Sequence, residues 1–228
     1  MTTTDEQPVK DGDPLRALDA AAARAVVDPH AAIEALPWLG DSIDADASDG
    51  RFARWGHSTV IDENTGSEVV SADLFRALHD RAGIPATFPV GNAGLLHVYG
   101  YLLSTTPTPY GLKRERWLDG ALARAYGRAA DAFLPWTPPS ATGTLLRRVE
   151  AAAGALLATG AVHEEPAGDA VGRIAIARRS PTGPAALAYA LDRDGERRLI
   201  TTFPVASPEA VLAAVRSEGP RLRWNATP

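Results

Sequence analysis

Cysteine is absent from the 228 residues of this chain. Its absence excludes disulfide bonds, thiolate nucleophiles, zinc sites with cysteine ligands and iron–sulfur clusters. Long apolar runs are absent too, because nowhere do about eighteen apolar residues follow one another, and no transmembrane helix is expected. The first residues are polar and acidic and lack the apolar segment of a secretory signal. We therefore expect a cytoplasmic protein that contacts no membrane.

Lysine is scarce as well, since Lys10 and Lys113 are the only two in a total of 23 basic residues. We interpret the excess of arginine and alanine as the codon bias of a bacterial high-GC genome, which gives Lys113 more weight than a single arginine. The net charge of −5 and the pI near 5.5 argue against a general affinity for nucleic acid. Hydrophobic content of 45% is ordinary for a globular protein.

Motifs that would fix a reaction are also missing. The chain has no Gly-x-Ser-x-Gly elbow, no phosphate-binding loop, no dinucleotide-binding glycine pattern and no His-Glu-x-x-His. The acidic stretch 41–50 fails as a calcium loop, because counting from Asp44 puts Gly50 one place late and Trp55 at the twelfth position. We expect neither a metal nor a cofactor.

Turn and cap signals divide the N-terminal part into short elements. Residues 1–12 are expected to form a disordered tail. Asp-Pro pairs at 13–14 and 28–29 predict the starts of two helices. Ser71 and Gly83 are expected to cap and end a third helix. The remaining elements expected here are an irregular acidic loop at 37–50, a hairpin at 51–72 with its turn at 63–66, a buried strand at 94–105 and a helix at 113–126.

The fold class predicted is α+β, mainly antiparallel sheet with helices packed on it. Residues 144–228 are expected to form a helix-β-β-β-helix-β unit, because sequential strands joined by tight connections pair antiparallel. Its strands are expected at 172–179, 185–192, 197–205 and 221–225. Residues 13–134 would form an N-terminal α+β region, and the proline-rich stretch 135–143 is the best boundary between the two. We expect one shared core rather than two domains.

The stretch 103–117 combines hydroxyls, prolines and charge, and it is the candidate ligand site. Prolines stiffen the loop, and Gly111 allows a turn into the expected helix at 113–126. Basic side chains in the first turn of a helix oppose its dipole, and such local conflicts are expected at functional sites. Hydroxyls nearby could donate to the same anion. The candidate ligand-binding residues are Lys113, Arg114, Arg116, Ser104, Thr106, Thr108 and Tyr101. The alternative interpretation is a solvated loop that leads into a helix.

Proton transfer would fall to histidine or tyrosine near this stretch. His97 and His57 lie beside aromatic residues in expected strands, and imidazole titrates near neutral pH. Alternation along the expected strand would place His97, Tyr99 and Tyr101 on one face. The candidate catalytic residues are His97, His57, Tyr99 and Tyr110. A hydrogen-bonded structural role is the alternative for both histidines.

Three functions are compatible with these observations. The leading hypothesis is a cytoplasmic, metal-independent enzyme that acts on a small anionic metabolite, either a carboxylate or a phosphate ester. The alternative is a non-catalytic interaction or partner protein, because no catalytic signature is present. The third is a small ribonuclease-like domain, which the C-terminal helix and arginine-bearing sheet resemble in outline, although the net charge of −5 argues against it.

Overall fold

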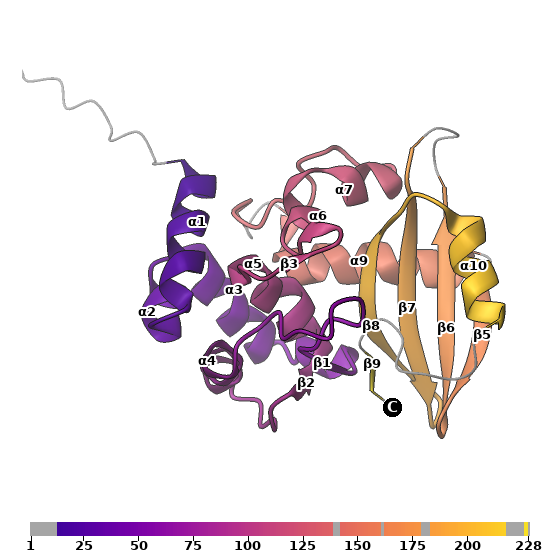
Figure 1. Ribbon diagram of the computed structural model, residues 1–228, viewed down its shortest axis with the longest axis horizontal. Helices are drawn as coiled ribbons and strands as arrows, with labels where there is room; N and C mark the ends of the chain where they lie inside the picture. Colours follow the sequence, from indigo (N-terminus) through magenta and orange to yellow (C-terminus); the bar gives the residue numbers. More distant parts are fainter. Residues whose placement is uncertain (1–12, 139–141, 161, 179–182, 218–225, 228) are drawn as a thin grey trace, which may run out of the picture.

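The computed structural model describes residues 13–138, 142–160, 162–178, 183–217 and 226–227. The fold is α+β with antiparallel sheets, which confirms the predicted class. Short helices form the N-terminal part, and a four-stranded sheet with its helices forms the C-terminal part (Figure 1). The expected tail at 1–12 and the expected strand at 221–225 lie outside the described residues. Within the described part, no helix has the length and apolar character needed to cross a bilayer.

The first helices begin where the sequence predicts. Asp13 and Asp28 each accept a hydrogen bond of 3.0 Å from a backbone N–H of the first turn, and a proline follows each. Ser71 caps α4 in the same way, and Gly83 ends it with φ +64°. The helices of this part are α1 (Pro14–Ala25), α2 (Pro29–Glu34), α3 (Pro37–Ser48), the 3-10 turn η1 (Arg51–Arg54) and α4 (Ala72–Ala82).

The acidic stretch expected as an irregular loop at 37–50 is instead the helix α3, and that prediction is wrong. Pro37 occupies the first helical position, where its missing N–H costs nothing. Leu39, Ile43 and Asp46 recur at helical spacing and are buried, while the other acidic side chains lie outward. The helical periodicity was hidden because a buried aspartate takes one of the core positions.

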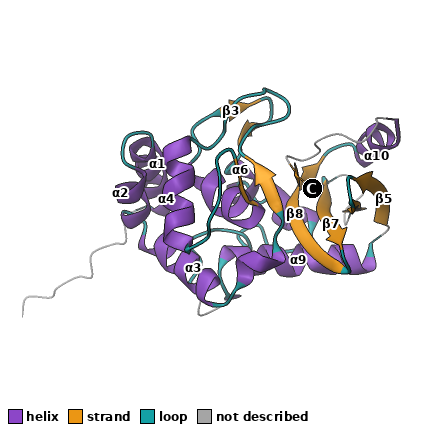
Figure 2. Cartoon of the chain, turned by 90° about the horizontal axis from the view of Figure 1, so that it is seen from below, coloured by secondary structure: helices purple, strands orange, loops and turns teal. Residues whose placement is uncertain are grey.

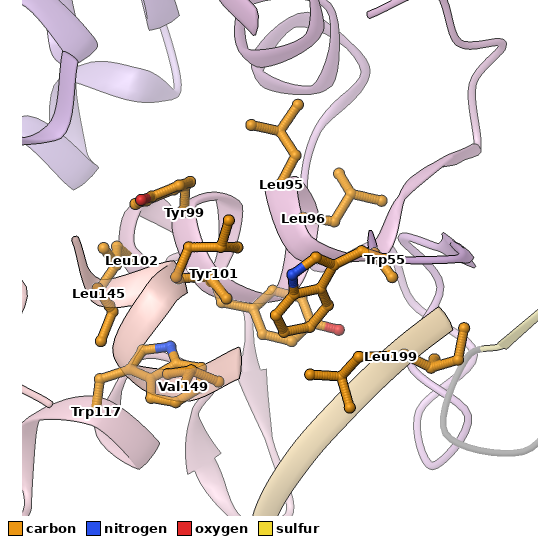
Figure 3. Packing of buried hydrophobic residues seen from close by; sticks show 14 of the residues in the cluster. Trp55, Leu95, Leu96, Tyr99, Tyr101, Leu102, Trp117, Leu145, Val149 and Leu199 are labelled. Carbon is orange, nitrogen blue, oxygen red and sulfur yellow. The ribbon is translucent and has the colours of Figure 1, made fainter. Parts of the chain in front are cut away.

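The segment expected as a strand at 94–105 is also helical, and that prediction is wrong. It forms the π-helical η2 (Leu95–Gly100), which continues into α5 (Tyr101–Leu103). Every residue from 95 to 103 is buried, so no exposed polar face reveals a helical period in the sequence. Tyr99 and Tyr101 point in different directions and do not share one face (Figure 3).

The helix expected at 113–126 is two short helices, α6 (Glu115–Leu118) and α7 (Ala121–Ala125). Gly120, with φ +71°, separates them, and this backbone conformation favours glycine. Before them, β3 (Pro107–Thr108) and β4 (Gly111–Leu112) form a small antiparallel hairpin. Lys113 and Arg114 therefore precede the helix, and the expected conflict with a long helix dipole does not arise.

The hairpin expected at 51–72 does not form as a sheet, although Gly66 does turn the chain with φ +66°. The two arms meet at a bridge between Ile61 and Glu68, beside which the N–H of Asp62 donates to Ser67 and that of Val69 to Val60, both over 2.9 Å. Instead, β1 (His57–Thr59) pairs antiparallel with β2 (Val90–Asn92) on one side and with β9 (Ala226–Thr227) on the other. The strand partners of β1 are therefore distant in the sequence and do not come from the other arm of the expected hairpin.

The C-terminal sheet has the strand order β5-β6-β7-β8, and each neighbouring pair is antiparallel. This sheet contains the predicted run of three strands and one more, β5, which the predicted order did not include. Helix α9 (Leu145–Thr159) lies along one face, and α10 (Pro208–Ser217) lies on the other side (Figure 2). The strands are β5 (Val162–Ala167), β6 (Ala170–Ala177), β7 (Ala185–Arg193) and β8 (Glu196–Val205).

Buried side chains from both parts belong to one apolar cluster (Figure 3). Trp55 forms a bridge with Leu199 of β8. A polar link lies nearby: Tyr99 donates to Asp46 over 2.5 Å, and Thr144, the cap of α9, donates to the same carboxylate over 2.8 Å. Burial raises the pKa of Asp46 even though these hydrogen bonds oppose the shift. Whether residues 135–143 separate two domains stays a prediction, which limited proteolysis would test.

Replacing Asp46 by alanine should lower the free energy of unfolding by about 3 kcal/mol, because the hydroxyls of Tyr99 and Thr144 then stay buried without their acceptor. Asp44→Ala is the matched control on the same helix, since the Asp44 side chain is half exposed and pairs with Arg81. The control should cost about 1 kcal/mol or less. Urea unfolding measures both, and equal losses would contradict this role of Asp46.

Candidate functional site

A cavity of about 560 Å³ opens between the β3–β4 hairpin with α6 on one side and the end of β8 with the start of α10 on the other. It brings together part of the predicted site. The predicted residues that line it are His97, Tyr101, Thr108, Tyr110, Lys113 and Arg116. The volume falls within the range typical of small-molecule sites.

Arg116 carries a positive charge into this cavity. Its Nη1 donates to Thr201 Oγ1 and to the carbonyl oxygen of Thr202, both over 3.3 Å. The guanidinium carbon lies 5.0 Å from the centroid of the Tyr101 ring and 6.0 Å from that of Phe203. Burial lowers the pKa of Arg116, but an arginine stays protonated. Within the described residues no carboxylate lies within 4.0 Å of Arg116, and Asp62 acts on its charge only from a longer distance.

Lys113 lies beside Arg116 and has a carboxylate partner. Its Nζ is 2.5 Å from Asp62 Oδ2, and Asp62 is fully buried. Burial, reinforced by the charge of Arg116, lowers the pKa of Lys113 in spite of this partner. Burial acts to raise the pKa of Asp62, but the hydrogen bond and the charge of Lys113, together with the backbone N–H groups of Asn64 and Thr65, outweigh it and the pKa falls. The Lys113 ammonium lies 5.7 Å from the Tyr101 ring centroid.

The other oxygen of Asp62 is held by its own turn. Asp62 Oδ1 accepts the backbone N–H groups of Asn64 over 2.9 Å and Thr65 over 3.1 Å. The turn therefore holds the Asp62 carboxylate in place independently of Lys113. Asp62 offsets the charge of Lys113, which is one of the two cations that border the cavity.

His97 lies behind Tyr101, with the two rings stacked at 4.9 Å. Its Nδ1 is 2.8 Å from the carbonyl oxygen of Ile200, and its Nε2 is 2.9 Å from Ser58 Oγ. A carbonyl only accepts, so Nδ1 carries the proton and Nε2 accepts from Ser58. Burial, with the charge of Arg116 second, lowers the pKa of His97 to about 3. Both ring nitrogens are engaged, and this arrangement favours a positioning role over proton transfer.

The other predicted site residues lie elsewhere. Tyr99 faces Asp46, and Arg114 pairs with Asp19 of α1 over 2.7 Å. Thr106 donates to the carbonyl oxygen of Glu68. The structure also places two further candidates outside the cavity of Arg116: Ser104, which is buried, and His57, which lines a separate cavity of about 400 Å³.

Sequence reasoning missed several residues of the cavity. Asp62 is the most important, because it holds Lys113 from a position that is distant in the sequence. The pattern Asp-Glu-Asn-Thr-Gly predicts a turn, but nothing in it indicates that its aspartate forms an ion pair with Lys113. The missed lining residues include Asp62, Glu63, Thr201, Phe203, Ser207 and Val211.

No three histidine, aspartate or glutamate side chains in the described part of the chain are arranged to hold a metal ion. Comparison of the chain with protein-family models, with curated proteins and with solved structures gives no match. The function is therefore argued from the geometry of the cavity.

His97 should stay neutral from pH 8 down to about pH 4, because its folded pKa of about 3 lies well below the ordinary value of 6.5. Imidazole ¹⁵N shifts would show a protonated Nδ1 throughout, with the exposed His30 as the comparison within the same spectra. The unfolded chain binds a proton below pH 6.5 that the folded chain does not, so this group reduces stability as pH falls. A His97 that titrates near pH 6.5 would contradict the arrangement.

Proposed function

We propose that the protein binds a small anionic metabolite in the cavity of Arg116 and acts on it as a metal-independent enzyme in the cytoplasm. The observation that carries this proposal is the positive charge of Arg116, which borders the cavity without a carboxylate partner among the described residues. A partly buried charge is costly when nothing compensates it. An anionic ligand would supply the compensation.

The charges around the cavity favour a carboxylate over a phosphate ester. Glu63, Glu115 and Asp119 are exposed and also line it, so a dianion would be repelled more strongly than a monoanion. The planar guanidinium of Arg116 matches the geometry of a carboxylate. A monocarboxylate with a polar group beside the carboxyl is the ligand that suits these side chains best.

Chemistry on such a ligand would fall to the side chains that face it. His97 is neutral and hydrogen-bonded at both nitrogens, so it supports Tyr101 instead of moving a proton. Tyr110 lies at the opening, 80% exposed. Lys113 and Asp62 form a charged pair at the cavity wall and are the groups best placed to exchange a proton with the ligand.

Arg116→Ala and Lys113→Ala should each weaken thermal stabilisation by anionic metabolites, and the double variant should abolish it. A ligand at about 100 times its Kd stabilises by about 2.7 kcal/mol, which raises the Tm by several degrees for a chain of this size. Arg124→Ala is the matched control, because Arg124 is exposed and does not line the cavity. Differential scanning fluorimetry with a panel of carboxylates and phosphate esters measures the shift.

Two results would contradict the proposal. One is a panel that shifts the Tm of neither wild type nor Arg124→Ala. The other is a shift that survives in the double variant, which would place the anion at a different site.

A further inference from the structure

We propose that Lys113 forms an imine with the carbonyl carbon of a 2-oxo acid whose carboxylate is bound by Arg116. This inference rests on the proposed function and deepens it, because it names the substrate class and a catalytic residue. The geometry supports it: the Lys113 ammonium and the Arg116 guanidinium lie 5.7 Å and 5.0 Å from the centroid of one ring, that of Tyr101, and both line the cavity. A 2-oxo acid carries a carboxylate for Arg116 and a carbonyl for Lys113 in one small molecule.

The amine must be neutral to attack a carbonyl carbon, and its surroundings favour that state. A lysine loses its proton more easily when it is desolvated or lies next to another cation. Both conditions hold for Lys113, whose pKa is lowered by burial and then by Arg116, while Asp62 and Glu63 oppose the shift. The other titratable groups that line the same cavity are His97, Tyr101, Tyr110, Glu115 and Asp119.

Asp62 supplies the proton transfers that imine formation needs. Its carboxylate is 2.5 Å from Lys113 Nζ and accepts a proton from the ammonium. The neutral amine then forms the N–C bond to the carbonyl carbon as the C=O π bond breaks, and the nitrogen passes one of its two protons to the oxygen, which becomes a hydroxyl. Asp62 returns its proton to this hydroxyl, the C–O bond breaks, and water leaves as the imine forms. Neither an oxidant nor a reductant takes part.

A structural ion pair is the competing role for Lys113. That role would account for the contact with Asp62 and nothing more. A structural ion pair does not require Lys113 to line a cavity. It does not require Arg116 beside the amine either, because a neighbouring positive charge destabilises the protonated form of Lys113. The two roles differ in one observable, which is reaction with a carbonyl compound.

The test treats the full chain with pyruvate and sodium cyanoborohydride, which reduces an imine to a stable secondary amine. Peptide mass spectrometry should place the adduct on Lys113, and Lys10, the other lysine of the chain, serves as the internal control. Lys113→Arg keeps the positive charge and should give no adduct. Modification of Lys10 to an equal or greater extent than Lys113 would overturn the inference.

Lactate separates this inference from the proposed function, because it keeps the carboxylate and lacks the carbonyl. If lactate raises the Tm in an Arg116-dependent way and pyruvate leaves Lys113 unmodified, the imine role is overturned and the anion site stands. If neither compound stabilises the protein nor modifies it, both are overturned. Adduct formation on Lys113 together with stabilisation by lactate supports both.

The pH profile of trapping tests the part played by Arg116. Propanal is the probe, because it has no carboxylate and its reaction reports the amine alone. Arg116→Gln removes the neighbouring positive charge, so Lys113 should keep its proton to higher pH and the profile should move upward. Arg124→Gln should leave the profile where it is. If the pH profile of trapping does not move in Arg116→Gln, the inference that Arg116 favours the neutral amine of Lys113 is overturned.

Discussion

The burial of the helical segment 95–103 on every side is the constraint on which the rest of the structure depends. A buried polar group needs a partner inside the protein, and this segment carries three polar aromatic side chains. His97 bonds to Ser58 of β1 and to the Ile200 carbonyl of β8, while Tyr99 bonds to Asp46 of α3. Tyr101 faces the cations of the cavity. One helix thus joins the N-terminal helices, the sheet and the candidate site.

This arrangement ties the stability of the core to the chemistry of the cavity. Tyr101 is held from behind by the stacked ring of His97, which is itself fixed by two hydrogen bonds. The ring held in this way presents one face to Arg116 and Lys113, and both cations lie over it in the structure without a ligand. Such preorganisation would lower the cost of binding the proposed ligand, because few side chains would have to be ordered. The turn of Asp62 gives Lys113 a carboxylate partner, whereas Arg116 has no carboxylate at ion-pair distance among the described residues.

The sequence predicts the parts of this structure that depend on local signals. Asp13, Asp28 and Ser71 cap helices as expected, and three of the four strands of the C-terminal sheet, β6 to β8, follow from runs between turn residues. The cluster of charge at 113–116 marks one wall of the cavity. The helical segment 95–103 was not predictable in the same way, because a segment that is buried on all sides has no exposed polar face to reveal its helical period. The pairing of Asp62 with Lys113 depends on tertiary contacts alone, and no local pattern carries it.

The central claim is that the guanidinium of Arg116, held over Tyr101, receives the carboxylate of a small ligand. The side-chain Nε–Hε resonance of Arg116, assigned by its loss in Arg116→Ala, reports this contact directly when lactate is titrated into the protein. The account predicts a saturable shift of that resonance while the resonance of Arg124 stays in place. An Arg116 resonance that does not move at lactate concentrations that raise the Tm would contradict the claim, because the anion would then bind elsewhere.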